Sequence, residues 1–187
     1  MMHHVLRVPL KGPFPEEFDS AYFAMGCFWG AERLFWGLKG IFSTSVGYTG
    51  GLTSSPNYET VCAGQTYHAE AVQIVFNTAV ISYLDLLEIF WKSHDPTQGM
   101  RQGNDRGTQY RSAIFSNNEA QLNLALETRK QFQHAIKRQG KEGDITTELA
   151  PLGDYYFAEE YHQQYLSKNP QGYCGIKGNG IECNFKI

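Results

Sequence analysis

The chain has 187 residues, of which 42% are hydrophobic and 19% charged, and its net charge is −3. This length supports one folded domain whose core needs neither a metal nor a crosslink. The lysines and arginines are scattered, which argues against nucleic acid as a partner. The chain shows no signal-peptide pattern and no run of the ~20 apolar residues that a membrane span needs. We therefore expect a cytoplasmic protein with neither nucleic acid nor a membrane as partner.

The first half of the chain is predicted to consist of strands and one helix. Residues 1–18 contain three prolines and are expected to form an extended arm on the surface. After this arm, β-branched and aromatic residues indicate strands, and apolar residues three and four positions apart indicate a helix. Glycine, serine and proline mark a long turn region over residues 47–57. The predicted elements are strands over residues 19–25, 41–48 and 67–76, and a helix over residues 29–38.

The second half is predicted to be richer in helix. Ser82 is placed to cap a helix that runs to about residue 92, and a polar loop containing glycine follows over residues 94–109. Residues 116–119 match the capping-box pattern and predict the start of the longest helix, which ends before Gly140. Further strands are predicted over residues 110–115 and 145–149, and a short helix over residues 157–166.

This order of elements predicts an α+β fold, a two-layer sandwich with a mixed or antiparallel sheet and a ferredoxin-like core. The connections are too irregular for a doubly wound parallel sheet. We divide the chain into the arm at residues 1–18, a catalytic domain at residues 19–168 and a tail at residues 169–187. The tail is rich in glycine and irregular, so we expect it to be mobile.

Cys27 lies in the sequence GCFWG, at the predicted turn from a strand to a helix. A thiol attacks as the thiolate, and the unpaired N–H groups at a helix N-terminus lower the pKa of a cysteine placed there. Cys27 is therefore a candidate nucleophile, and a buried, unreactive cysteine is the alternative. Phe28 and Trp29 follow directly, and at least one of them is expected to line a pocket for a small apolar group.

Cys174 and Cys183 lie in the tail among four glycines. Two thiols on a flexible arm suit disulfide exchange, because the arm can bring each thiol to its partner. Three other interpretations are open. A zinc site lacks the usual close cysteine pairs, a structural disulfide is disfavoured in a reducing cytosol, and the two cysteines can also be unpaired residues of a disordered end.

Polar residues supply further candidates. Glu70 lies on a strand of apolar residues, where burial would raise its pKa and keep it protonated as a general acid. From the pattern alone, a Glu70 that faces solvent or pairs with an arginine is the stronger interpretation. Tyr58 and Tyr110 are candidate hydrogen-bond donors, and Asp105 lies in a loop whose length and polarity indicate a function. His68 shares a face with Glu70 and is interpreted as a structural histidine.

Six motifs follow one another between about residue 20 and residue 175. They are GCFWG at 26–30, GYTGG at 47–51, NYE at 57–59, GQTYHAEAV at 64–72, HDPTQGMRQGNDRGTQYRS at 94–112 and GYCG at 172–175. Together they resemble the A class of peptide methionine sulfoxide reductases, and several are long enough to make chance negligible. The resemblance implies reduction of methionine-S-sulfoxide, protein-bound and free, to methionine, and hence repair of oxidised proteins.

The resemblance also implies a role for each candidate residue. The redox positions are matched by Cys27 as the nucleophile that becomes a sulfenic acid, Cys174 as the resolving thiol and Cys183 as the recycling thiol. Glu70 matches the general acid. The substrate-binding positions are matched by Phe28, Trp29, Tyr58, Asp105 and Tyr110. Cys62 matches no catalytic position and is expected to be buried and inert. No bound cofactor or metal is implied, and the monomeric enzyme would take electrons from thioredoxin, or from dithiothreitol in vitro.

Four alternatives are weighed against the reductase interpretation. A hydrolase or transamidase would use Cys27 with His68 or His94 as its base, and it would need no cysteine in the tail. A binding module without catalysis would hold methionine-containing peptides in an aromatic cleft. A peroxidase-like thiol protein is disfavoured because the pocket next to Cys27 is bulky and aromatic. A metal site formed by His94, Asp95 and Asp105 ranks low, because the spacing of these residues matches no common site.

Overall fold

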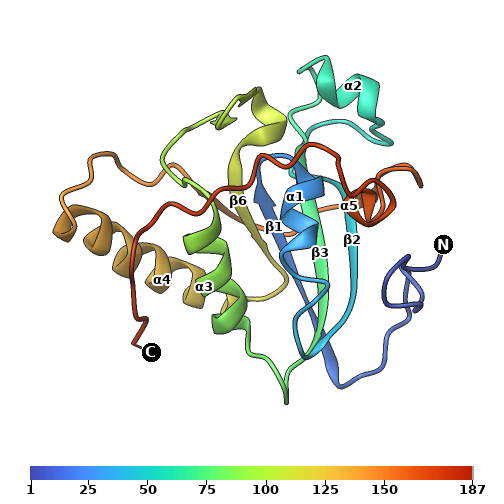
Figure 1. Ribbon diagram of the computed structural model, residues 1–187, viewed down its shortest axis with the longest axis horizontal. Coiled ribbons are helices and arrows are strands. Elements are labelled where there is room, and N and C mark those ends of the chain that lie inside the picture. Colours follow the sequence, from blue (N-terminus) through green and yellow to red (C-terminus); the bar gives the residue numbers. More distant parts are fainter. Residues whose placement is uncertain (187) are drawn as a thin grey trace.

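The computed structural model describes residues 1–186 of the chain (Figure 1). Its strands are β1 (Phe18–Met25), β2 (Ile41–Thr49), β3 (Ala69–Asn77), β4 (Arg101–Gln102), β5 (Asp105–Arg106), β6 (Ser112–Ser116), β7 (Glu148–Pro151) and β8 (Tyr156–Phe157). Its helices are α1 (Phe28–Arg33), α2 (Tyr58–Cys62), α3 (Tyr83–Ser93), the short 3-10 helix η1 (Thr108–Tyr110), α4 (Glu119–Arg138) and α5 (Tyr165–Lys168). Across residues 1–186, none of these helices is long and apolar enough to cross a membrane.

Six strands form one mixed sheet in the order β7-β6-β1-β3-β2-β8. The central pairs are antiparallel, whereas β6 and β7 run parallel. Since α1 connects β1 to β2 and α3 connects β3 to β6, the central four strands have the split βαβ arrangement of a ferredoxin-like core. The predicted α+β sandwich with a mixed sheet is thus confirmed.

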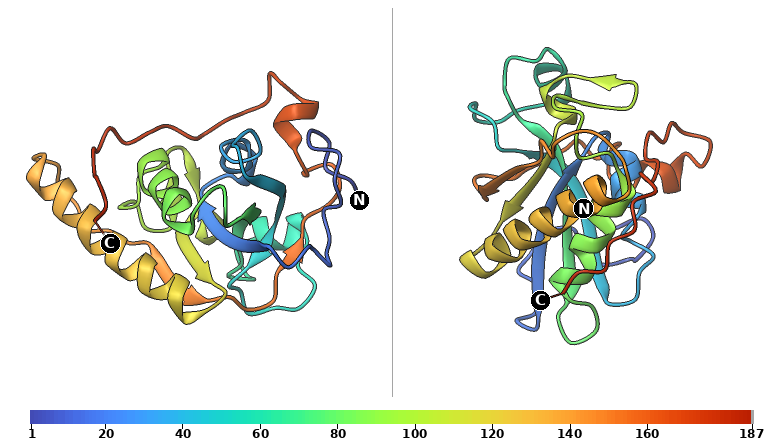
Figure 2. Two further views of the ribbon diagram at one scale, coloured as in Figure 1. Left: turned by 90° about the horizontal axis from the view of Figure 1, so that it is seen from below. Right: turned by 90° about the vertical axis from the view of Figure 1, so that its left-hand side faces the viewer.

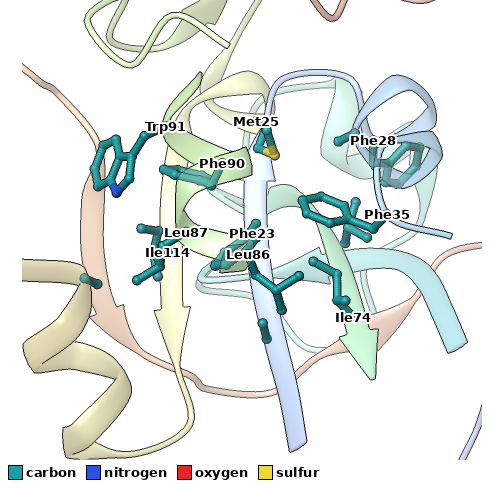
Figure 3. Close-up of a cluster of buried hydrophobic side chains, with 14 of the residues drawn as sticks. Phe23, Met25, Phe28, Phe35, Ile74, Leu86, Leu87, Phe90, Trp91 and Ile114 are labelled. Carbon is teal, nitrogen blue, oxygen red and sulfur yellow. The ribbon is translucent and has the colours of Figure 1, made fainter. Parts of the chain in front are cut away.

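The main hydrophobic core lies between the sheet and helices α1, α3 and α4 (Figures 2 and 3). Alternation along β3 sends Val72 and Ile74 into this core and Ala71 to the opposite face. The opposite face carries four alanines together with Tyr22 and Phe115, and residues of the segment 150–155 pack against it. The core side chains labelled in Figure 3 are Phe23, Met25, Phe28, Phe35, Ile74, Leu86, Leu87, Phe90, Trp91 and Ile114.

Helix α4 begins at a different cap from the one predicted. Ser116 belongs to β6 and pairs with Pro151 of β7, so it is held in an extended conformation. The N-cap residue is Asn118, whose Oδ1 accepts a hydrogen bond from the backbone N–H of Gln121 at 2.9 Å. The predicted capping box at residues 116–119 is therefore wrong, although the helix itself is present.

Replacing Asn118 by alanine is expected to lower the free energy of unfolding by about 1 kcal/mol, because the N–H of Gln121 loses its acceptor. Asn123 lies exposed in the middle of the same helix and gives a matched control. Asn123→Ala should leave stability unchanged or raise it by up to about 0.7 kcal/mol, since alanine favours the helix. Chemical denaturation followed by circular dichroism measures both effects, and equal losses in the two variants would contradict the cap.

The short helix predicted over residues 157–166 is largely wrong. Phe157 ends β8, which pairs with Gly47 of β2, so this residue is extended. Gln164 has a left-handed backbone with φ of 49°, and its backbone N–H donates to the buried carboxylate of Glu32 at 2.8 Å. Only the four residues of α5 remain helical. Long-range contacts with β2 and Glu32 thus determine the conformation of this segment.

The first residues also depart from the expected extended arm. Met2 pairs with Pro9, so the segment folds back on itself. His3 is fully buried, and its Nε2 lies 2.9 Å from Oγ1 of Thr44 on β2. Leu10 is buried as well. The burial of two side chains, rather than proline content, determines the shape of this segment.

The tail from residue 169 contains no helix or strand in its described part, residues 169–186. It runs from α5 past α1 and ends beside α3 and α4 (Figures 1 and 2). Asn179 ties it to the end of α3, because its Nδ2 donates to the carbonyl oxygens of Trp91 and His94, each at 2.6 Å. The mobility of the tail stays a prediction.

Candidate active site

Cys27 lies at the junction of β1 and α1, as the sequence pattern predicts. The chain turns at Gly26, whose φ of +91° is a conformation that side chains disfavour. A Cβ at Gly26 would also lie 2.7 Å from the side chain of Gln102. The turn therefore needs glycine, and it makes Cys27 the N-cap residue of α1.

Glu70 lies on β3, on the face of the sheet that the helices cover, and is 2% exposed. Its Oε2 accepts a hydrogen bond from the backbone N–H of Phe28 at 3.0 Å, one residue beyond Cys27. This N–H belongs to the first turn of α1, where backbone donors have no partner within the helix. Burial raises the pKa of Glu70 to about 8, although the bond from Phe28 acts in the opposite direction. At neutral pH the protonated acid therefore predominates.

The expectation that Cys27 has a lowered pKa is wrong. Burial raises the pKa of this thiol well above its usual range, and the nearby charge of Glu70 raises it further. The backbone N–H groups of Trp29 and Gly30 do lower it, but by less than the other two effects raise it. α1 has only six residues, so its dipole stabilises the thiolate only weakly. Cys27 thus rests as a neutral thiol beside a neutral acid.

Phe28 and Trp29 form an aromatic wall next to Cys27. Phe28 is buried, and its ring centroid lies 5.1 Å from that of His162. Trp29 stacks on Tyr165 at 3.8 Å, and its indole Nε1 donates to Nδ1 of His162 at 2.9 Å. These contacts fix the orientation of Trp29, so the wall is rigid before substrate arrives.

His162 and Glu159 support this wall and were not identified from the sequence. Because Nδ1 of His162 accepts from Trp29, the ring is neutral, and burial lowers its pKa to about 4. Glu159 accepts hydrogen bonds from the hydroxyl of Tyr48 at 2.9 Å and the backbone N–H of Tyr58 at 2.8 Å. Both residues lie in the segment predicted as a helix, for which no functional residue was proposed from the sequence. The signal that could have revealed them is the cluster of aromatic and titratable side chains over residues 159–165.

Tyr58 begins α2 and Tyr110 ends η1, so two separate loops bring these hydroxyls toward Glu70. Burial raises the pKa of both tyrosines, and the charge of Glu70 adds to the increase. Both hydroxyls therefore stay protonated and are able to donate. Asp105 lies on β5, and its Oδ2 accepts a hydrogen bond from the hydroxyl of Tyr173 in the tail at 3.1 Å. The substrate-binding residues predicted from the sequence are thus brought around one site.

The four cysteines are free and lie in different environments. Cys174 lies against α1, where its Sγ accepts a hydrogen bond from Nη2 of Arg33 at 3.1 Å. Cys183 is buried in the hydrophobic core, near Lys92 of α3 and Arg138 of α4. In this structure the tail therefore places Cys174, but not Cys183, on the helix that carries Cys27. Cys62 is exposed, so the expectation that it is buried was wrong.

The histidines proposed as alternative bases have structural roles. Nε2 of His68 lies 2.7 Å from the carbonyl oxygen of Thr53. His94 uses both ring nitrogens, one with the carbonyl oxygen of Phe90 at 2.8 Å and the other with the hydroxyl of Ser112 at 2.7 Å. Burial lowers the pKa of His94 to about 4, so this ring stays neutral. The hydrolase interpretation therefore has no support from either ring.

Comparison with known proteins points to one family. The sequence profile of the family described as peptide methionine sulfoxide reductase matches residues 19–186. "Peptide methionine sulfoxide reductase MsrA" of Salinispora arenicola is 61% identical over 183 residues, 97% of this chain and 83% of the relative. The corresponding protein of Agrobacterium fabrum is 56% identical over 182 residues, 97% of this chain and 84% of the relative.

Solved structures agree with the sequence comparison. Methionine sulfoxide reductase A of Corynebacterium diphtheriae has a TM-score of 0.83 and 42% identity, over 99% of this chain and 89% of that one. Reduced Mxr1 from Saccharomyces cerevisiae has a TM-score of 0.78 and 38% identity, over 86% of this chain and 91% of that one. Together with the thiol, the buried acid and the aromatic wall, these matches show that the chain belongs to the peptide methionine sulfoxide reductase family and is an oxidoreductase of its A class.

Proposed function

We propose that the enzyme reduces methionine-S-sulfoxide, both in proteins and as the free amino acid, by attack of Cys27 on the sulfoxide sulfur. The observation that carries this proposal is the position of Glu70. This buried acid, with a pKa raised to about 8, bonds to the backbone N–H that directly follows Cys27. A sulfoxide sulfur becomes electrophilic when its oxygen receives a proton or a strong hydrogen bond, and the site holds its proton donor beside the nucleophile.

The substrate methyl group packs against Phe28 and Trp29. Trp29 is fixed by Tyr165 and His162, so the wall presents one apolar surface to the substrate. The sulfoxide oxygen points toward Glu70, with the hydroxyls of Tyr58 and Tyr110 as further donors. The site thus fixes the directions of three groups around the substrate sulfur, which are the methyl group, the oxygen and the attacking sulfur. Only one configuration at the substrate sulfur then leaves the rest of methionine pointing out of the site. Similarity to the A class assigns this configuration to the S epimer.

In the reductase step, Cys27 first gives its proton to solvent. Its sulfur then bonds to the substrate sulfur while Glu70 protonates the oxygen. This S–S bond and the S–O bond of the substrate then break as the hydroxyl passes to the sulfur of Cys27, which leaves a sulfenic acid and methionine. Cys27 is oxidised by two electrons, and the sulfoxide is reduced to methionine. Glu70 is left as a carboxylate and recovers its proton from solvent, so that charge and protons balance.

The enzyme returns to its reduced form through the tail. The sulfur of Cys174 bonds to that of Cys27, and the hydroxyl leaves as water. Cys183 then attacks Cys174 and releases Cys27, which requires that Cys183 leave the core in which it is buried. The donor we propose for the last disulfide is a thioredoxin. Mxr1 from Saccharomyces cerevisiae, whose fold this chain shares, has been solved in complex with Trx2.

The four free thiols fit a reducing compartment, so we place the enzyme in the cytoplasm, where it acts as a monomer in the repair of oxidised proteins. Disulfides are rare in such a compartment, because glutathione and thioredoxin keep thiols reduced.

The test is incubation of the enzyme with each sulfoxide epimer and dithiothreitol, followed by mass analysis of the substrate. We expect methionine from the S epimer alone, and none from Cys27→Ser with either epimer. Cys62→Ser is the matched control for the loss of a thiol, because Cys62 lies outside the proposed relay and serine keeps an acceptor for the neighbouring hydroxyl of Tyr58, so the rate should be unchanged. Full activity in Cys27→Ser, or equal rates for the two epimers, would overturn the proposal.

A further inference from the structure

One face of α1 carries the residues that surround the resolving thiol. Cys27, Gly30 and Arg33 are three positions apart, so they follow one another along the helix about 4.5 Å apart. Nη2 of Arg33 donates to Sγ of Cys174 at 3.1 Å. A Cβ at Gly30 would lie 3.0 Å from the same sulfur. Cys174 therefore rests over Gly30, with the nucleophile on one side and the guanidinium on the other.

The bare surface at Gly30 allows this approach. A Cβ there would also lie 2.8 Å from Cγ1 of Ile176, so any larger residue would push the tail away from α1. The backbone of Gly30 is ordinary helix, and the helix does not itself need glycine at this position. Close packing of the tail, rather than backbone conformation, accounts for glycine at this position.

The guanidinium of Arg33 differs from the other groups near Cys174. It is charged at every physiological pH and has only donors, so in the contact the sulfur is the acceptor. Other groups near this stretch of the tail include Asp105, which accepts a hydrogen bond from Tyr173, and the thiol of Cys27. Among these groups, Arg33 is the one that donates a hydrogen bond to the sulfur of Cys174.

We propose that Arg33 is a positioning residue for the resolving step, holding the sulfur of Cys174 over Gly30 and within reach of oxidised Cys27. This inference rests on the resolving role proposed for Cys174. The sulfur of Cys174 donates the electron pair of the new S–S bond to the sulfur of Cys27, the S–O bond of the sulfenic acid breaks, and hydroxide leaves and takes a proton to form water. Arg33 acts through Cys174 and is itself unchanged.

The experiment is a single turnover with excess sulfoxide and no reductant, sampled by rapid quench. Methionine formation reports the reductase step, and the Cys27–Cys174 disulfide, measured by mass analysis, reports the resolving step. In Arg33→Gln, we expect methionine to form at the wild-type rate and the disulfide to form roughly 10-fold to 100-fold more slowly, the range for loss of a hydrogen bond to a charged group. A sulfenic acid that dimedone traps should accumulate at Cys27.

Two further variants separate this role from a structural one. A cation in the last turn also favours the helix dipole, so Arg33→Lys, which keeps the charge, should restore most of the rate of disulfide formation. Lys39→Gln removes another exposed cation close to α1 and should change neither step. Gly30→Ala should slow disulfide formation alone, because alanine favours the helix and only the tail is displaced.

The outcomes distinguish this proposal from the one on which it rests. If Cys27 still forms a disulfide in the Cys174→Ser variant, another thiol resolves the sulfenic acid, and the resolving role of Cys174 fails. If Cys174→Ser forms none but Arg33→Gln matches the wild type, the role of Arg33 alone is overturned. Equal slowing of methionine and disulfide formation in Arg33→Gln, with no recovery in Arg33→Lys, would mean that Arg33 supports only the fold of α1 and would also overturn it.

Discussion

Replacing Glu70 by glutamine is expected to slow methionine formation by roughly 10²- to 10⁴-fold, the usual contribution of a general acid. Glutamine keeps an oxygen that can accept from the N–H of Phe28, so the fold should be preserved. What is lost is the proton that the sulfoxide oxygen must receive. Rapid-quench measurement of the first turnover isolates this step from the later disulfide exchange.

The same substitution should make the thiol easier to ionise. Above its own pKa of about 8, Glu70 is charged, and this charge is the second-largest cause that raises the pKa of Cys27, so a neutral side chain at position 70 should lower that pKa. Alkylation of Cys27 by iodoacetamide over a range of pH measures this shift. A variant with more thiolate and a slower reductase step would show that the proton donor, rather than the supply of thiolate, limits the reaction. A first turnover as fast as that of the wild type would remove the acid role.

Replacing Cys174 by serine is expected to abolish steady-state turnover with thioredoxin while leaving the first turnover intact. Each enzyme molecule should form one methionine and stop as the sulfenic acid, because no thiol next to Cys27 remains to displace the hydroxyl. The wild-type enzyme should instead lose two free thiols in one turnover without reductant. Thiol titration combined with mass analysis of peptides measures both results.

Cys183→Ser examines the last step of the relay. If Cys183 is the recycling thiol, this variant should accumulate the Cys27–Cys174 disulfide and turn over slowly with thioredoxin, whereas dithiothreitol should still restore it. The matched control is Cys62→Ser, which should lose two thiols like the wild type. Normal steady-state activity of Cys174→Ser with thioredoxin would exclude the relay.

Much of the fold follows from local pattern. The strand and turn around Cys27 are predictable because apolar residues end at a glycine with positive φ, and Ser82 caps α3 as expected. Errors occur where distant residues decide the conformation. Gln164, for example, is bound by Glu32, which lies 132 positions earlier in the sequence. No window of neighbouring residues contains that information.

The residues of the candidate site also differ in how far the local sequence predicts them. Motifs place Cys27, Phe28 and Trp29 together because they are adjacent in sequence. The role of Glu70 is harder to predict, since the sequence pattern alone favours a solvent-facing carboxylate. Only the structure shows that Glu70 is 2% exposed. The support of Trp29 by His162 spans 133 positions, and the contact of Arg33 with Cys174 spans 141. Such partners become visible only after the chain has folded.

Asn179 divides the tail into two parts that make different contacts. Through its side chain this residue binds the last carbonyl groups of α3, and the part of the tail after it packs against the body of the protein. Cys174 lies before Asn179 and against α1, so the first step of the proposed relay can leave the contacts of Asn179 in place. Cys183 lies after Asn179 and is buried in the core, so the second step requires that this part of the tail leave its packing. The two steps of the relay thus differ in how much of the packing of the tail each disrupts.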